Sequence, residues 1–491
     1  MVFSSTIFLF IFLPCVLVGY YLIDRRFRNV FLLLASLLFY AWGEQRFVFV
    51  MMASILMNHL FAMVIDSAMK NAEHLEGRST QVAYLRKAKR WLRITVVFNL
   101  AIFFVYKYLN FTIRNVNALS GLIGKQLLNQ TDIALPIGIS FFTFQAMSYV
   151  FDVYYRRGRV QKNPLNTALY VALFPQLIAG PIVRYETVAQ EIKERKETLS
   201  DFAEGIRRFI LGLAKKVILA NSLAILADHA FSYTDFSRLS VVMAWLGGVA
   251  YSFQIYFDFS GYSDMAIGLG RMFGFHFLEN FEYPYISRSV SEFWRRWHIS
   301  LGSWFRDYVY FPLGGSRVNS RKKLVRNLFI VWLLTGIWHG AAWNFIAWGL
   351  MYFVLLTFEK LSGWPDRLPE GWMRCIYRVF TLLTILLGWV LFRADSLKTA
   401  LSYIAAMFGL MGNRFCDSSA LFQLRGNALV ILLAIICSVP ILKRLKQTKF
   451  FFGEKRLASD AISFVVYICI FLVAVSFTVA STYNPFIYFN F

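Results

Sequence analysis

The sequence is poor in charged residues, and this scarcity excludes an ordinary soluble protein. Only 16% of its 491 residues are charged and 58% are hydrophobic, against about 25% and about 45–50% in soluble domains. A chain of this length would have to bury more apolar surface than several soluble cores hold. Disordered, collagen-like and disulfide-scaffold chains are excluded as well. The remaining class is a polytopic membrane protein.

Cysteine is also scarce, and familiar catalytic motifs are missing. The five cysteines are scattered and form no CxxC pair, so neither a metal site nor a disulfide framework is predicted. No GxSxG, GxxxxGK, GxGxxG or HExxH motif is present. Hydrolase, NTPase and redox functions are therefore disfavoured. The chain shows no clear internal repeat.

Acidic residues are few, with 28 Asp and Glu against 51 Lys and Arg, and the net charge is +23. In a soluble protein this excess would suggest nucleic acid. Here the basic residues lie in short runs between apolar stretches, as in the cytoplasmic loops of membrane proteins. We expect anionic lipid and a phosphorylated cytosolic substrate as partners, and no nucleic acid.

The apolar stretches predict an all-α polytopic membrane protein with about 11–13 transmembrane helices in one domain, residues 1–491. A last span with an outward-facing aromatic tail is expected over 460–491. Basic loops at 69–93 and 443–456 predict that both termini lie outside, which implies an even number of crossings. The predicted spans are roughly 3–22, 29–43, 46–67, 94–112, 134–155, 165–183, 206–228, 239–257, 324–340, 342–358, 377–394, 425–442 and 460–481.

Two of the six histidines stand out. His339 lies within residues 328–358, which contain no Asp, Glu, Lys or Arg, and a polar group at membrane depth is a candidate functional residue. The alternative is a histidine that hydrogen-bonds between helices. Glycine and alanine residues beside it would let a ligand or another backbone approach.

His298 is predicted to lie on one amphipathic helix that starts with a capping box at Ser289 and Glu292. Helical spacing puts Trp294 and His298 on the aromatic face, whereas Arg306 lies on the opposite, charged face. The alternative is an interfacial anchor with an incidental histidine.

Two acidic residues, Asp258 and Asp264, also occur among apolar neighbours, in YFDFSGYSD. This pattern predicts a polar turn that lines a cavity. We expect the two carboxylates to pair with Arg295, Arg296 or Arg306, in a structural ion pair rather than in acid–base chemistry.

Several long stretches between residue 1 and about 350 are distinctive. They are MVFSSTIFLFIFLP, LPIGISFFTFQAMSYVFDVYY, FPQLIAGPIVRY, YFDFSGYSDMAIGLGRMFGF, ENFEYPYISRSVSEFWRRWHISLGSWFRDYVYFPLGG and GIWHGAAWNFIAWG. In these stretches the sequence resembles the membrane-bound O-acyltransferase family, and in particular its bacterial alginate O-acetyltransferase branch.

The resemblance implies a ring of helices around a thinned centre with a through-tunnel. The family's invariant histidine matches His339, and its second motif position matches His298. An aromatic tail similar to that of some relatives makes Tyr488 a candidate acyl relay. The residues expected to line or support the tunnel are Asp258, Asp264, Trp338, Trp343, Asn344 and Arg306.

The resemblance further implies transfer of an acetyl group from cytosolic acetyl-CoA, with no permanently bound cofactor, to an exported cell-surface polysaccharide such as alginate or peptidoglycan. His339 would act as general base, and His298 would orient the donor or stabilise the oxyanion. We expect a bacterial inner-membrane location and a periplasmic or extracellular acetyltransferase partner. D-alanyl transfer from a carrier protein to teichoic acid, a polysaccharide transporter or flippase, and a scaffold for a secretion complex are the alternatives.

Overall fold

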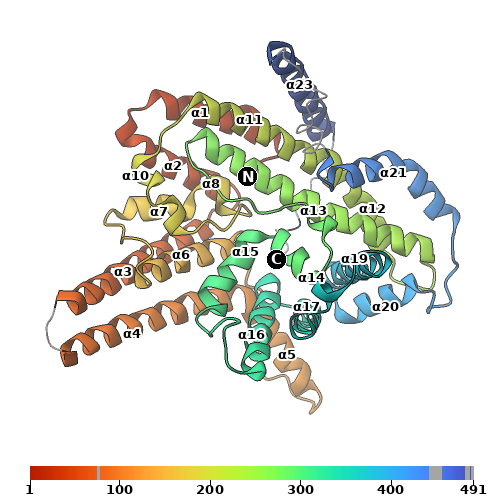
Figure 1. Ribbon diagram of the computed structural model, residues 1–491, viewed down its shortest axis with the longest axis horizontal. Helices are drawn as coiled ribbons and strands as arrows, with labels where there is room; N and C mark the ends of the chain where they lie inside the picture. Colours follow the sequence, from red (N-terminus) through yellow and green to blue (C-terminus); the bar gives the residue numbers. More distant parts are fainter. Residues whose placement is uncertain (75–77, 442–455, 481–486, 488–491) are drawn as a thin grey trace. The chain divides into compact units, whose positions relative to one another are not determined.

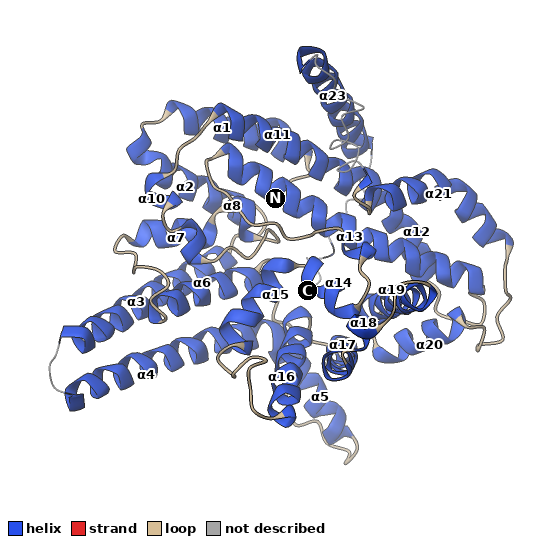
Figure 2. Cartoon of the chain, in the orientation of Figure 1, coloured by secondary structure: helices blue, strands red, loops and turns tan. Residues whose placement is uncertain are grey.

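The computed structural model describes residues 1–74, 78–441, 456–480 and 487, and within these ranges it contains helices and loops but no strand (Figure 2). The all-α prediction is therefore confirmed. The chain divides into two compact units, Met1–Ile206 with Ala266–Leu278, and Arg207–Met265 with Glu279–Phe491. Helices α11 (Leu199–Ala214) and α13 (Val241–Met272) each contribute residues to both units.

The remaining helices of the first unit include three short π or 3-10 segments, marked η. They are η1 (Phe8–Phe12), α1 (Leu13–Leu22), η2 (Arg25–Phe27), α2 (Arg28–Ala41), α3 (Phe47–His74), α4 (Arg78–Phe103), η3 (Phe104–Tyr108), α5 (Leu109–Gly121), α6 (Ile139–Tyr154), α7 (Pro164–Ala172), α8 (Phe174–Leu177), α9 (Tyr185–Val188) and α10 (Glu191–Glu194).

Helices α3 and α4 lie side by side in the first unit (Figure 1). Asn58 and Asn99 join them through two reciprocal amide hydrogen bonds, of 3.0 and 2.8 Å. Both side chains are buried. Because an unpaired amide is costly in an apolar setting, this pair favours one register between the two helices.

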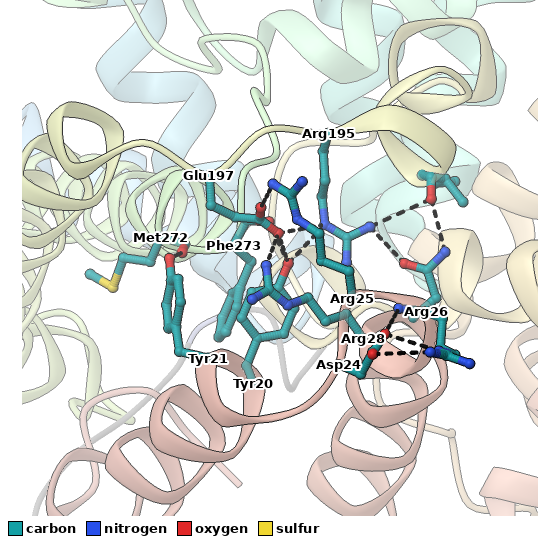
Figure 3. Close-up of polar contacts among 12 residues, drawn as sticks. Tyr20, Tyr21, Asp24, Arg25, Arg26, Arg28, Arg195, Glu197, Met272 and Phe273 are labelled. Carbon is teal, nitrogen blue, oxygen red and sulfur yellow. Dashed lines mark hydrogen bonds and ion pairs between the residues drawn. The ribbon is translucent and has the colours of Figure 1, made fainter.

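Glu197, in the segment before α11, forms polar contacts with residues in and beside the turn between α1 and α2 (Figure 3). Its carboxylate accepts a hydrogen bond from the Tyr20 hydroxyl and forms ion pairs with Arg28 at 2.9 Å and Arg25 at 3.3 Å. Arg195 donates to the same Tyr20 hydroxyl at 2.9 Å. Arg25 and Arg28 are thus structural partners of the Glu197 carboxylate, whereas Arg26 pairs with Asp24.

The second unit contains the following further elements. They are η4 (Lys215–Ala220), α12 (Asn221–Phe231), η5 (Pro284–Ile286), α14 (Val290–Arg296), α15 (Ile299–Phe305), η6 (Arg306–Tyr310), α16 (Arg321–His339), α17 (Trp343–Ser362), α18 (Trp364–Arg367), α19 (Trp372–Arg393), α20 (Leu397–Met407), α21 (Ser418–Cys437) and α23 (Arg456–Ala480).

Helices α16 and α17 cross at glycines in the second unit. A Cβ atom on Gly336 would lie 2.6 Å from the carbonyl oxygen of Phe345, and one on Gly349 would lie 2.5 Å from that of Trp332. The expected approach of another backbone beside His339 is therefore confirmed, because only glycine leaves room for this crossing.

Seven helices in the described part of the chain are long and apolar enough to cross a membrane, and the chain is a multi-pass membrane protein. They are Phe47–His74, Arg78–Gly121, Leu199–Phe231, Trp343–Ser362, Trp372–Arg393, Ser418–Cys437 and Ala461–Ala480; Phe8–Leu22 is a shorter apolar helix.

This number is below the 11–13 expected, because several predicted spans are short or broken. The predicted span 165–183 consists of the short helices α7 and α8, and 134–155 corresponds to the 16 residues of α6. The predicted basic loop 443–456 falls, except for Arg456, outside the described residues. One membrane domain, a ring and a tunnel stay predictions.

Candidate active site

The second unit contains a cavity of about 270 Å³ whose wall includes both candidate histidines. Helices α14, α15 and α16 and the residues that join or follow them supply the wall. The lining residues are Ser291, Trp294, Arg295, Trp297, His298, Ile299, Leu301, Gly302, Ser303, Phe305, Arg306, Val331, Trp332, Thr335 and His339. The structure therefore brings together the two residues that the sequence indicated.

His339 is the last residue of α16 and is buried among aromatic rings. Its ring centroid lies 4.9 Å from that of Trp338, 5.0 Å from that of Trp348 and 5.1 Å from that of Phe392, all close to edge-on. The chain then leaves the helix at Gly340, where a Cβ atom would lie 2.2 Å from the Phe345 ring. Packing thus fixes the imidazole beside the cavity.

His298 interrupts the predicted amphipathic helix. Its backbone is left-handed, with a φ of +44°, and Trp297 before it is extended, so α14 and α15 are two separate helices. The prediction of one continuous helix was wrong. It rested on the helical spacing of aromatic and charged residues, and this spacing does not reveal that one residue takes a left-handed backbone conformation. The predicted cap is confirmed, since the Ser289 hydroxyl accepts from the Glu292 backbone N–H at 3.1 Å.

At this interruption, the His298 ring points into the protein interior. Its centroid lies 4.6 Å from that of Phe259 and 5.9 Å from that of Trp338. His298 is 2% exposed and lies outside the helices that are apolar enough to cross a membrane. Burial lowers the pKa of His298 to about 3, because the apolar surroundings disfavour the charged form. The ring is therefore neutral at physiological pH.

Glu359 of α17 holds the start of α14 in place. Its two carboxylate oxygens accept from the backbone N–H groups of Val290 at 2.8 Å and Ser291 at 2.7 Å. The Tyr377 hydroxyl, on α19, donates to it at 2.7 Å. The buried carboxylate thus ties the helix that precedes His298 to two long apolar helices. A lone acid near the end of an apolar stretch gave no sign of this role in the sequence.

Asp258 and Asp264 lie inside α13, so the predicted polar turn was wrong. Asp258 pairs with Lys216 at 2.6 Å, and Asp264 pairs with Lys215 at 2.6 Å and Arg208 at 2.8 Å. The expectation of ion pairs is confirmed, but the expected arginine partners were wrong. Neither acid lines the cavity.

The reason for these partners is a close helix crossing. A Cβ atom on Gly212 would lie 2.6 Å from the carbonyl oxygen of Gly261, so α11 and α13 nearly touch there. The π-helical η4 then follows, and its two lysines meet the two acids. Two of the expected arginines pair locally instead, Arg296 with Glu292 and Arg306 with Asp307.

Of the other residues predicted to line or support a tunnel, some lie at the cavity and some do not. Arg306 lines the cavity, and Trp338 contacts both histidines. Asn344 is buried and donates to the carbonyl oxygens of Leu391 and Ala394, which secures the end of α19. Trp343 is 57% exposed and does not line the cavity.

Tyr488 lies outside the described residues. Its neighbour Ile487 is buried, and the Ile487 backbone N–H donates to Asp258 at 2.9 Å.

Among the described residues, no group of three or more His, Cys, Asp or Glu side chains is arranged to hold a metal ion.

Comparison with known proteins places this chain in a family. The model of the membrane-bound O-acyltransferase family matches residues 39–364. A probable alginate O-acetylase of Azotobacter vinelandii is 45% identical over 83% of this chain and 78% of its own length. The peptidoglycan O-acetyltransferase of Helicobacter pylori is 33% identical over 100% of this chain and 98% of its own length.

A third relative is more distant. The teichoic acid D-alanyltransferase of Bacillus subtilis is 31% identical over 52% of this chain and 68% of its own length. The family model covers more than half of the chain and includes both cavity histidines. The chain therefore belongs to the membrane-bound O-acyltransferase family and is an acyltransferase.

Proposed function

We propose that this protein transfers an acetyl group from acetyl-CoA for the O-acetylation of an exported cell-surface polysaccharide. The observation that carries the proposal is the pair of buried histidines on one cavity. Two relatives named for O-acetylation of alginate and peptidoglycan support the acetyl group and the polysaccharide. Family membership favours this enzyme over a transporter or a scaffold.

The cavity suits a small acyl group. Its volume of about 270 Å³ lies just below the range of about 300–1,000 Å³ that is typical of drug-sized ligand sites. Arg295 and Arg306 line it and are exposed, so an anionic donor would meet positive charge there. Three other basic residues of this unit, Arg208, Lys215 and Lys216, form ion pairs with Asp264 and Asp258.

In the proposed reaction, His339 accepts the proton of an incoming hydroxyl while the hydroxyl oxygen attacks the thioester carbonyl. A C–O bond forms, the C–S bond breaks, and the proton passes to the leaving thiolate. Aromatic rings around His339 exclude water from this step. No permanently bound cofactor takes part.

We further propose that Tyr488 relays the acetyl group to a periplasmic or extracellular partner. Ile487, the residue before it, belongs to the same buried cluster as Trp348 and Phe392, whose rings contact His339. In this proposal the protein lies in the bacterial inner membrane with both termini outside.

Donor identity tests the function. Purified protein in proteoliposomes is incubated with labelled acetyl-CoA or with a D-alanyl carrier thioester, and release of the free thiol is followed. We expect turnover of acetyl-CoA that the empty liposomes do not show. Turnover of the D-alanyl thioester alone would contradict the proposal and favour the teichoic acid alternative.

The relay has its own test, namely mass spectrometry of the C-terminal peptide after incubation with labelled donor. An acetyl group on Tyr488, absent from Tyr488→Phe, is the expected result. An active enzyme whose trapped Tyr488 stays unmodified would rule the relay out.

A further inference from the structure

Asn280 is a buried amide whose orientation is fixed by its neighbours. It is 1% exposed and lies in the loop between α13 and η5. Its Oδ1 accepts from the Ser300 backbone N–H at 3.2 Å, and its Nδ2 donates to the Ser263 hydroxyl at 3.1 Å. Because a backbone N–H can only donate, the amide oxygen and not the nitrogen faces this side.

The same oxygen determines where His298 carries its proton. His298 Nδ1 lies 3.2 Å from Asn280 Oδ1. An amide oxygen only accepts hydrogen bonds, so Nδ1 must be the protonated nitrogen. The Ser300 hydroxyl donates to Asn280 at 2.9 Å, and its oxygen also lies 3.4 Å from His298 Nδ1. Because its proton is used on Asn280, that oxygen can only accept from Nδ1, which agrees with a protonated Nδ1. A neutral imidazole has one N–H, and Nε2 therefore presents a lone pair.

The remaining nitrogen of His298 has no hydrogen-bond partner in the part of the chain that the structure describes. Nε2 is buried and makes no hydrogen bond to any described residue, although His298 forms part of the cavity wall. An unsatisfied buried acceptor is unfavourable, and a left-handed non-glycine residue adds backbone strain. Two unfavourable features at one residue are typical of a functional position.

We infer that Asn280 is a positioning residue that keeps His298 as the Nδ1–H tautomer, so that Nε2 accepts a hydrogen bond from an O–H or N–H group of the bound substrate. This inference rests on the proposed acyl transfer. A nitrogen without a proton cannot donate to a thioester oxyanion. Of the two roles expected for His298, orienting the substrate is therefore favoured over stabilising the oxyanion.

The tautomer is directly measurable by ¹⁵N NMR of histidine-labelled protein, because protonated and bare imidazole nitrogens resonate far apart. Only six histidines contribute, and the signals lost in His298→Asn identify those of His298. We expect a protonated Nδ1 and a bare Nε2 in the wild type. A protonated Nε2 would overturn the inference, and this result does not depend on acyl transfer.

Variants of Asn280 separate positioning from simple packing. Asn280→Ala should let the Nε2–H signal grow, whereas Asn280→Asp should keep the Nδ1–H tautomer and raise the pKa of His298, because a carboxylate stabilises the imidazolium. Asn327→Ala is the matched control. It removes another buried amide of the same unit, which donates to two loop carbonyls and accepts from the Arg326 guanidinium, and should leave the His298 signals unchanged.

Kinetics identify the group that Nε2 binds. We expect Asn280→Ala to lower kcat/KM for transfer by about 100-fold, and Asn280→Asp to retain more activity with its acidic limb moved to higher pH. A raised KM for the thioester alone indicates an N–H of the donor, and a raised KM for the acceptor alone indicates its hydroxyl. Unchanged kcat and KM in Asn280→Ala would contradict the inference.

Discussion

His298 and His339 line the same cavity, although one lies between two short helices and the other ends a long one. Trp338 contacts both, with ring centroids 5.9 Å from His298 and 4.9 Å from His339. The indole therefore holds the two imidazoles at a fixed separation. If the two histidines act as proposed, the reaction depends on the packing of a single aromatic side chain.

Replacing Trp338 should affect both stability and rate. Trp338→Ala would remove a large buried side chain, which typically costs about 3–5 kcal/mol of unfolding free energy, and should lower acetyl transfer because both histidines lose a neighbour. Trp338→Phe should keep most of both. Unfolding in detergent and transfer assays measure the effects. Wild-type stability and rate in Trp338→Ala would show that the indole does not hold the site.

Gly336→Ala should push α16 and α17 apart, because its Cβ atom would lie 2.6 Å from the Phe345 carbonyl oxygen. Overpacking of this kind typically costs about 1–3 kcal/mol. We expect a lower melting temperature and slower transfer, since α16 carries His339. Gly426→Ala in α21 is the control, because no atom lies within 4 Å of its added Cβ. Equal effects of the two substitutions would refute the close-crossing explanation.

The buried pair of Lys216 and Asp258 should be sensitive to the loss of one partner. Both side chains are 2% exposed, and removing one member of a buried pair typically costs about 3–5 kcal/mol. Asp258→Leu should therefore destabilise the protein strongly, whereas Asp258→Leu combined with Lys216→Met should recover much of the loss. A double-mutant cycle on chemical unfolding tests this. Additive losses would mean that the two charges do not stabilise each other.

His276 should make stability depend on pH. Its burial would lower its pKa, but hydrogen bonds to Glu191 at 2.8 Å and Asp201 at 3.3 Å outweigh this and raise it above its ordinary value. A raised native pKa contributes stability below about pH 6.5 that is lost as the pH rises through the native pKa.

The pH dependence can be isolated with His276→Gln. Between pH 6 and pH 8, the melting temperature of the wild type should fall by more than that of the variant. His74→Gln, at an exposed histidine, is the control. Parallel curves for wild type and His276→Gln would exclude this linkage.

The sequence predicted the helical membrane class and the two cavity histidines, because both depend on local patterns. Apolar stretches define α3, α17 and α19 without reference to the rest of the chain. His339 was detectable as a polar residue in an uncharged stretch, and His298 through its motif.

The contacts that build the site were not predictable in the same way. The left-handed backbone of His298 and its bond to Asn280 depend on residues distant in the sequence. Glu359 caps α14 from another helix. The partners of Asp258 and Asp264 were wrong, because glycine packing between α11 and α13 and not sequence proximity decides which cations reach them.

The most direct test of the central claim is the rate of acetyl transfer from acetyl-CoA by His339→Ala in proteoliposomes, compared with wild type and with His74→Ala. Loss of a general base typically lowers a rate by about 10²–10⁴-fold. We predict a loss of this size in a His339→Ala protein that remains folded, and a wild-type rate in His74→Ala. Wild-type transfer by a folded His339→Ala protein would contradict the account.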